Sequence, residues 1–335
     1  MGANLKIKED IYKREREYFS KYACFSDSTL GRQKEEEPCS MRTPFQRDRD
    51  RIIYSKAFLR LKNKTQVFFS PEGDHYMTRL THTLEVTQIA RSIARVLNLN
   101  EDLTEAIALG HDLGHTPFGH SGERLLNMLS PNGFKHNEQS LRVVDVLEND
   151  GKGLNLTFEV RDGILNHKLS GNPKTLEGEV VSLSDRIAYL NHDVEDAIRA
   201  GLISVNKMPE IVLKVLGRSS TQRINSMINA VYNESYNKDK ISVSSKVQEA
   251  MSVFREFMFE KVYNTDAARG EEEKAYKMLT AIYEHFMKFP EKLPAPYKKL
   301  LDSYPKEQVI CDYISGMTDR YAVSVMKSLF IPENF

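Results

Sequence analysis

The chain has 335 residues, of which 40% are hydrophobic and 28% are charged, the balance of an ordinary folded protein. Its length allows one large domain or two smaller ones and is well above the size at which a core is hard to build. Basic and acidic residues number 47 each, so net charge does not indicate a nucleic acid or a membrane as the partner.

In chain order, residues 1–17 are highly charged and lack the apolar stretch of a signal peptide. Residues 26–40 are predicted to be a mobile loop. Beyond them, apolar residues recur at helical spacing, and strand patterns are confined to the short segments 65–69 and 153–156. The sequence therefore predicts an all-α fold with at most a small β-hairpin. The predicted helices cover residues 83–97, 101–113, 137–148, 179–200, 209–216, 247–263, 271–289 and 306–329.

The sequence predicts that the chain is divided into three regions. Residues 1–40 are predicted to be an N-terminal extension with its loop, residues 41–205 a catalytic core, and residues 206–335 a helical region packed on that core. No stretch approaches the roughly 18 consecutive apolar residues of a membrane-spanning helix, so no membrane is expected. The three cysteines form neither a disulfide framework nor a paired metal motif, which favours a reducing cytoplasm.

Histidines cluster in one part of the chain, with eight of the nine between residues 75 and 192. His111 and Asp112 follow an apolar helical pattern that would bury them, and burying a carboxylate beside an imidazole is costly unless it is paired or bound to a metal. These two groups suit a divalent first-row ion, with His82 and Asp185 as the further ligands. The alternative is a hydrogen-bonded structural pair, with His82 and Asp185 as ordinary core or capping residues.

These residues stand in motifs that resemble a known family. The order His82, His111-Asp112, Asp185 resembles the signature of HD-superfamily phosphohydrolases. The flanking segments resemble bacterial deoxyguanosine triphosphate triphosphohydrolase-like proteins, although Leu59 and Met77 stand where the pattern has arginine. The segments that carry the resemblance are 42–52, 64–67, 78–86, 111–123, 189–197 and 312–320.

The resemblance implies a fold, an activity and a cofactor. The fold is an HD-domain helical bundle. The activity is metal-dependent hydrolysis of a deoxynucleoside triphosphate, through water attack at the α-phosphorus, to a deoxynucleoside and inorganic triphosphate. The cofactor is a divalent ion, Mn, Mg, Fe, Ni, Co or Zn. Family analogy also implies a homo-oligomer. The metal ligands carried over are His82, His111, Asp112 and Asp185.

His120 and Glu123 fit the role of a general acid and its orienting carboxylate. They are three residues apart and would share one helical face if residues 121–129 are helical. General acids typically contribute ~100 to 10,000-fold, and the resemblance implies the same two positions. The alternative is a helix cap with a first-turn carboxylate. His136 is a second candidate imidazole, unless it is an ordinary loop residue.

Substrate contacts follow from similarity to the vertebrate deoxynucleotide triphosphohydrolase of the same superfamily. That similarity implies that Gln66 and Asp193 meet the 3′-hydroxyl and that Tyr189 packs beneath the deoxyribose, leaving no room for a 2′-hydroxyl. Asp185, Tyr189 and Asp193 are four residues apart and share one helical face. Core packing is the alternative for Tyr189. The phosphate contacts implied are Arg79 and Arg186.

A basic segment runs from Arg42 to Lys64 and holds eight lysines and arginines. It suits an anionic ligand, which could be the substrate triphosphate, an allosteric nucleotide or a single-stranded nucleic acid. A solvated helix face with Asp48 and Asp50 as partners is the alternative. Two other functions remain open for the chain. One is another HD-type nucleotide phosphohydrolase or phosphodiesterase, and the other is a nucleotide-sensing or nucleic-acid-binding protein with a vestigial site.

Overall fold

The computed structural model describes residues 2–66, 77–263 and 266–332. Within these ranges the secondary structure is helical, and the β-type pairs are two isolated bridges, Arg32–Thr157 and Thr65–Thr78. The predicted all-α fold is confirmed. Of the two strand candidates, residues 67–69 lie outside the described ranges. Residues 153–156 do not form a strand, because Gly153 and Asn155 both have positive φ, which is incompatible with extended pairing.

The helices form two compact units, each assembled from segments far apart in the sequence. Among the described residues, the first unit contains 2–53, 82–111 and 155–263, and the second contains 54–66, 77–81, 112–154 and 266–332. The region boundaries at residues 40 and 205 stay predictions.

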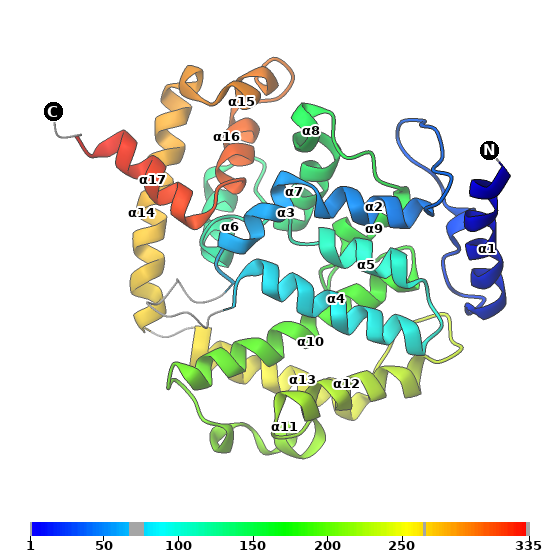
Figure 1. Cartoon of the computed structure of the whole chain (residues 1–335). Helices are drawn as coiled ribbons and strands as arrows, with labels where there is room; N and C mark the ends of the chain where they lie inside the picture. The colour runs from blue at the N-terminus through cyan, green and yellow to red at the C-terminus, as the bar shows by residue number, and fades with distance from the viewer. Residues whose placement is uncertain (1, 67–76, 264–265, 333–335) are drawn as a thin grey trace. The chain divides into compact units, whose positions relative to one another are not determined.

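The first unit is built around the 24-residue helix α10, which packs against α5, α9, α12 and α13 (Figure 1). α10 begins where the Thr175 hydroxyl accepts a hydrogen bond from the Gly178 N–H. α9 approaches α5 so closely that a β-carbon on Gly163 would lie 2.5 Å from Ile107 Cδ1. The helices of this unit are α1 (Gly2–Tyr18), α2 (Pro44–Ile53), α4 (Arg79–Val96, after its first three residues), α5 (Glu101–Gly110), α9 (Phe158–Asn166), α10 (Leu176–Arg199), α11 (Glu210–Val215), α12 (Ser220–Ser235) and α13 (Ser245–Met258).

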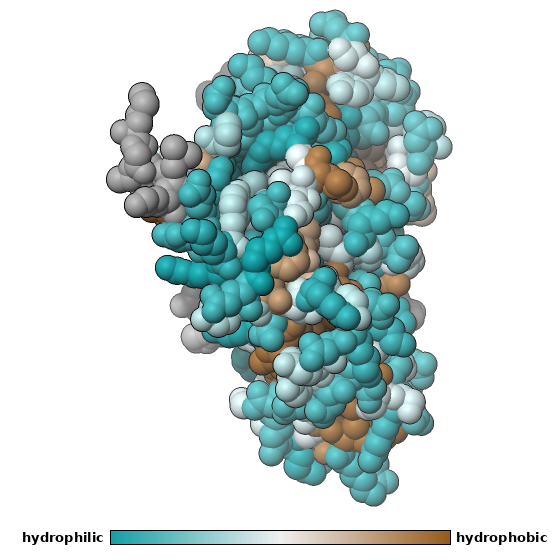
Figure 2. Space-filling view, turned by 90° about the vertical axis from the view of Figure 1, so that its right-hand side faces the viewer, coloured by the Kyte–Doolittle hydropathy of each residue, from teal (hydrophilic) through white to brown (hydrophobic). Residues whose placement is uncertain are grey.

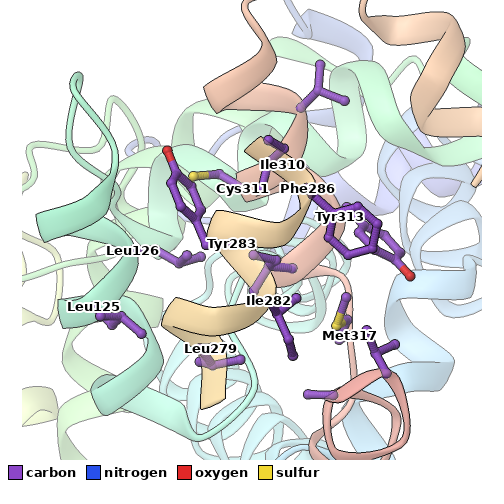
Figure 3. Packing of buried hydrophobic residues seen from close by; sticks show 14 of the residues in the cluster. Leu125, Leu126, Leu279, Ile282, Tyr283, Phe286, Ile310, Cys311, Tyr313 and Met317 are labelled. Atoms are coloured by element: carbon purple, nitrogen blue, oxygen red, sulfur yellow. The ribbon is translucent and has the colours of Figure 1, made fainter. Parts of the chain in front are cut away.

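The second unit has a core in which α14 packs against α6, α16 and α17 (Figure 3). α14 presents Leu279, Ile282, Tyr283 and Phe286 at helical spacing, which makes one apolar face. Leu126 of α6 is fully buried opposite them. Each such side chain contributes about 1.5–3 kcal/mol by leaving water. The helices of this unit are α3 (Lys56–Arg60), α6 (Gly119–Leu129), α7 (His136–Arg142), α8 (Glu148–Gly151), α14 (Asp266–Lys288), α15 (Ala295–Leu300), α16 (Lys306–Ser315) and α17 (Asp319–Phe330).

The helix predicted over residues 306–329 is two helices. α16 ends at Ser315, and Gly316 occupies its C-terminal cap. α17 begins at Asp319, after the Thr318 hydroxyl caps it by accepting from the Tyr321 N–H. The apolar spacing continues across this break, so periodicity alone did not reveal it.

Surface character gives no sign of a membrane span. Among the described residues, no helix combines the length and the apolar character that a bilayer crossing requires. The face drawn in Figure 2 is mostly hydrophilic, with its hydrophobic residues in separate small patches.

Candidate active site

Three predicted metal ligands meet in the first unit. His82 comes from α4, His111 follows α5, and Asp185 lies in α10. The Oδ1 atom of Asp185 is 3.1 Å from His82 Nε2 and 3.9 Å from His111 Nε2. Both imidazoles are buried, whereas the Asp185 carboxylate is 27% exposed. Two imidazole nitrogens and one carboxylate oxygen thus converge, and this donor set fits a divalent metal ion reached from solvent.

Each imidazole is oriented through its other ring nitrogen. The Nδ1 atom of His111 is 2.6 Å from the Ala108 carbonyl oxygen, which only a protonated Nδ1 can satisfy by donating. His111 Nε2 is then the nitrogen with a lone pair. His82 Nδ1 is 2.8 Å from His192 Nε2, and His192 Nδ1 is 2.6 Å from Asp193 Oδ1. Such outer partners typically fix the tautomer of metal-binding histidines, so the residues present fit the ion.

A further buried histidine lies beside this group. His167 Nδ1 is 2.8 Å from the Ile164 carbonyl oxygen, and its ring meets that of His111 edge to face, with the centroids 5.1 Å apart. No role was predicted for His167 or His192. Their position inside the histidine-rich stretch was the available signal, but it did not say which of them would face the ligands.

The remaining face of α10 carries two predicted sugar contacts. Tyr189 and Asp193 follow Asp185 at successive turns of one continuous helix. The hydroxyl of Tyr263 donates a short hydrogen bond to Asp193 Oδ2. Burial raises the pKa of Tyr189 and of Tyr263, so both hydroxyls stay protonated at neutral pH. Tyr263 was missed because no motif was recognised between residues 201 and 305.

Arg186, a predicted phosphate contact, is buried on the same helix. Its Nη2 atom lies 3.4 Å from Ser252 Oγ in α13, and its Nε has no hydrogen-bond partner among the described residues. Burial lowers the pKa of Arg186, and the nearby Arg255 acts in the same direction. A buried guanidinium with an unused N–H next to a second arginine suits an anionic group.

The second unit holds the other predicted ligand, Asp112, which follows His111 directly in the chain. Its Oδ2 atom accepts a hydrogen bond of 2.5 Å from Arg79 Nη1, and both side chains are buried. Arg79 Nη2 also lies 3.4 Å from the carbonyl oxygen of Gln66. The phosphate contact of Arg79 stays a prediction, and its guanidinium also holds Asp112 in place. The side-chain oxygen of Gln66 has no hydrogen-bond partner among the described residues.

The three predicted catalytic residues meet in this unit around one carboxylate. Glu123 Oε2 is 2.9 Å from His136 Nδ1 and 3.4 Å from His120 Nδ1, and Glu123 Oε1 accepts from the His136 backbone N–H at 2.9 Å. Burial opposes ionisation of Glu123, but its hydrogen bonds with the two histidines lower the pKa well below the usual range. By these distances Glu123 is closer to His136, which is buried, than to His120, whose side chain is 63% exposed.

His115 completes this group of imidazoles. Its ring is stacked on that of His136 with the centroids 4.6 Å apart, and it is 5.2 Å from the ring of His120. Burial, with help from the charge of Arg79, lowers the pKa of His115 well below its ordinary value, so the ring is neutral. Neither of its ring nitrogens has a hydrogen-bond partner among the described residues. No role was predicted for His115, although it lies in the segment 111–123 that carries the family resemblance.

The loop between α5 and α6 is shaped by close backbone packing. A β-carbon on Gly114 would lie 2.2 Å from the backbone nitrogen of Ser140 in α7, so only glycine fits. Phe118 and Gly119 both have left-handed backbone conformations, with φ of 61° and 58°. The chain therefore turns sharply just before His120 and starts α6 with that histidine in its first turn.

The basic segment 42–64 divides between the two units, and seven of its eight lysines and arginines have acidic or carbonyl partners. This is the arrangement of the alternative interpretation, a helix surface neutralised by neighbouring acids. The pairs are Arg42–Asp50, Arg47–Glu36, Arg49–Asp102, Arg51–Glu36, Lys56–Asp150 and Arg60–Glu148, and Lys64 donates to two backbone carbonyl groups.

Comparison with known families agrees with this geometry. The HD domain family matches residues 79–190, and a phosphohydrolase-associated domain matches residues 241–328. The paired imidazoles and carboxylates, together with the HD match, define an HD-domain phosphohydrolase with a site for a divalent metal.

Several curated relatives are similar over nearly their whole length. A deoxyguanosinetriphosphate triphosphohydrolase-like protein of Caldanaerobacter subterraneus subsp. tengcongensis is 55% identical, with 98% of this chain and 97% of that protein covered. Proteins with the same description from Clostridium perfringens strain 13 and Geobacter sulfurreducens are 45% and 39% identical, and each comparison covers at least 97% of both chains. The chain belongs to the deoxyguanosinetriphosphate triphosphohydrolase-like family.

Solved structures support the fold. A phosphohydrolase from Bacteroides thetaiotaomicron VPI-5482 matches with a TM-score of 0.54 at 19% identity, over 84% of this chain and 68% of that one. A hypothetical protein from Aquifex aeolicus matches with a TM-score of 0.50 at 22% identity, over 85% of this chain and 68% of that one. At these identities the likeness concerns the fold alone.

Proposed function

We propose that the protein hydrolyses deoxynucleoside triphosphates, such as dGTP, to a deoxynucleoside and inorganic triphosphate. The observation that carries the proposal is the face of α10 on which Tyr189 and Asp193 follow Asp185, the carboxylate that meets His82 and His111. Asp185, Tyr189 and Asp193 succeed one another by about one helical turn, roughly 5–6 Å each. A nucleotide whose α-phosphate lies at Asp185 would therefore meet Tyr189 and Asp193 with its deoxyribose.

In this proposal His82, His111 and Asp185 hold the divalent ion, together with Asp112. Asp112 is included because it follows His111 directly and completes the signature of the family. Bound there, the ion supplies Lewis-acid polarisation of the α-phosphate. Imidazole and carboxylate ligands accept several divalent ions, so availability in the cell decides among Mn, Mg, Fe, Ni, Co and Zn.

The remaining residues move protons and hold the substrate. Water attacks the α-phosphorus and releases a proton to solvent, while the bond to the 5′ oxygen breaks and that oxygen gains a proton from a general acid, which solvent then reprotonates. His120 gives this proton from Nε2, because its Nδ1 faces Glu123. Glu123 stabilises the protonated ring and orients His136 beside it. Arg186 binds a phosphate oxygen, and Gln66 and Asp193 bind the 3′-hydroxyl.

Product analysis tests the proposed function. The protein is incubated with each of the four deoxynucleoside triphosphates and one divalent metal at a time, and the products are separated by anion exchange. We expect equal amounts of deoxynucleoside and intact inorganic triphosphate, and no turnover after chelation of the metal. Release of a nucleoside monophosphate or diphosphate would favour another HD-type nucleotide phosphohydrolase. Stoichiometric metal without turnover would favour a sensing or nucleic-acid-binding protein.

Sugar selectivity is the second expectation. An aromatic ring packed beneath C2′ leaves no space for a ribose hydroxyl, and buried polar partners of the 3′-hydroxyl are left unpaired by a dideoxy analogue. We expect dGTP to be hydrolysed much faster than GTP or dideoxy-GTP. Tyr189→Phe should keep the preference for deoxyribose, whereas Tyr189→Ala should relax it. Asp193→Ala should reduce the penalty for dideoxy-GTP.

Rates decide between sugar recognition and ordinary packing. Relative kcat/KM values for the three nucleotides are measured in wild type and in each variant. Equal values for dGTP and GTP in wild type would contradict the deoxyribose pocket. An unchanged preference in Tyr189→Ala would return Tyr189 to a core-packing role.

A further inference from the structure

The motif Asp312–Arg320 has no part in the chemistry proposed above, although the sequence singles it out. It covers the end of α16 and the start of α17. We propose that two of its aspartates, the buried Asp312 and the half-buried Asp319, are positioning residues that set the distance between His120 and His136. This proposal rests on the proposed function for its catalytic meaning, but its geometry can be tested separately.

Asp319 holds the turn that precedes His120. Its Oδ1 atom accepts a hydrogen bond of 3.0 Å from the Phe118 N–H, and its Oδ2 atom accepts from the N–H of Thr65 at 2.9 Å and from the Thr65 hydroxyl. Phe118 has a left-handed backbone conformation, which is unfavourable for a bulky residue and persists only where the surroundings impose it. Phe118 lies two residues before His120. The hydrogen bond from its N–H to Asp319 helps to impose the left-handed conformation there.

Lys64 fastens the other end of the same loop. Its buried Nζ donates to the carbonyl oxygen of His115 at 2.5 Å and to that of Ser315 at 2.7 Å. Lys64 and Thr65 are neighbours in sequence, so one short segment ties both ends of the loop 115–118 to the motif. The loop is thus clamped between residues 64–65 on one side and residues 315–319 on the other.

Asp312 holds the helix that begins with His136. Its fully buried carboxylate accepts from Gln139 Nε2 at 3.0 Å and from Arg142 Nε and Nη2, both at 2.7 Å. Both partners belong to α7, whose first residue is His136. A bidentate arginine pair with an added amide donor fixes both the position and the rotation of a short helix.

The two aspartates hold the segments that carry His120 and His136, the two partners of Glu123 Oε2. Glu123 Oε2 faces Nδ1 of His120 and Nδ1 of His136, so it can serve both only while the loop and α7 keep their separation. A displacement of about 1 Å in a reacting group can cost on the order of 100-fold in rate. Loss of the Asp319 clamp should therefore slow the chemical step and leave the metal ligands and substrate affinity intact.

The test compares Asp319→Asn with Asp302→Asn, the same chemical change at an exposed aspartate of the same C-terminal region. Metal content, unfolding, kcat and KM are measured with dGTP and with an analogue in which sulfur replaces the bridging 5′ oxygen. A thiolate leaves without protonation. We expect Asp319→Asn to lower kcat on dGTP by about 100-fold, with unchanged KM and metal, and to affect the sulfur analogue much less. Asp302→Asn should match wild type.

Three results would overturn the inference: wild-type kcat in Asp319→Asn, an equal loss on both substrates, or loss of metal. If Asp319→Asn does not fold, Thr65→Val removes one hydrogen bond of the same clamp and should show a smaller loss of the same kind. Failure of the proposed function is distinct, since wild type would then release no triphosphate. In that case the NMR resonances of the histidine rings test the positioning role, because Asp319→Asn should shift those of His120 and leave those of His285 in α14 unchanged.

Discussion

Replacing His111 with alanine should release the divalent metal and abolish measurable hydrolysis of dGTP. The His111 Nε2 atom points to the same Asp185 oxygen as His82, and its Nδ1 is committed to the Ala108 carbonyl group. Removing this nitrogen leaves His82 and Asp185 as the proposed ligands of the first unit and opens one coordination position. Residues that only hydrogen-bond to a metal ligand are typically worth about 10–100-fold in metal affinity, so loss of a direct ligand should exceed that range.

Metal content after gel filtration and turnover of dGTP with added metal measure this effect. His285→Ala is the matched control, because His285 is the histidine outside the 75–192 stretch and lies in α14. Circular dichroism checks that both variants are folded. Stoichiometric metal together with near-wild-type turnover in His111→Ala would contradict its assignment as a ligand.

Replacing His120 with alanine should lower kcat on dGTP by about 100 to 10,000-fold while metal binding and KM are kept. The side chain is 63% exposed and is 3.4 Å from Glu123 Oε2, so its removal leaves no cavity in the core. A residue that donates a proton only in the transition state affects kcat and kcat/KM equally.

His136→Ala is the informative comparison, because Glu123 is closer to His136 than to His120. We expect a rate loss there too, accompanied by lower stability, since His136 is buried and stacked on His115. A rise in KM at unchanged kcat would make His120 a binding residue. A far larger loss of kcat in His136→Ala than in His120→Ala would transfer the proton donor to His136.

Much of the fold follows from apolar periodicity, which predicted the long helices α4, α10 and α14. It failed where capping residues end one helix and start the next while the apolar spacing continues, as at Gly316 and Thr318 between α16 and α17. It also passed over α1 and α12, where polar and charged residues dilute the apolar face. Helix caps and left-handed turns depend on contacts that hydrophobic spacing does not encode.

For the site, the signature residues His82, His111 and Asp185 do come together, as the buried histidine and aspartate pattern indicated. Partners from distant segments were not predictable. Tyr263 reaches Asp193 from 70 residues further along the chain, and periodicity tells which face is buried but not what covers it. Residue roles, the homo-oligomer, the cytoplasmic location and the region boundaries stay predictions.

The interleaving of segments has a consequence for how the chain is made. Leu126 of α6 is buried against α14, so its partners, such as Phe286, are synthesised roughly 160 residues later. At ~5–20 residues per second, a ribosome needs on the order of 10 s to make that stretch. During this time the apolar face of α6 has emerged and cannot yet be covered. A nascent chain that stalls before α14 should therefore depend on chaperones and be an early target of proteases.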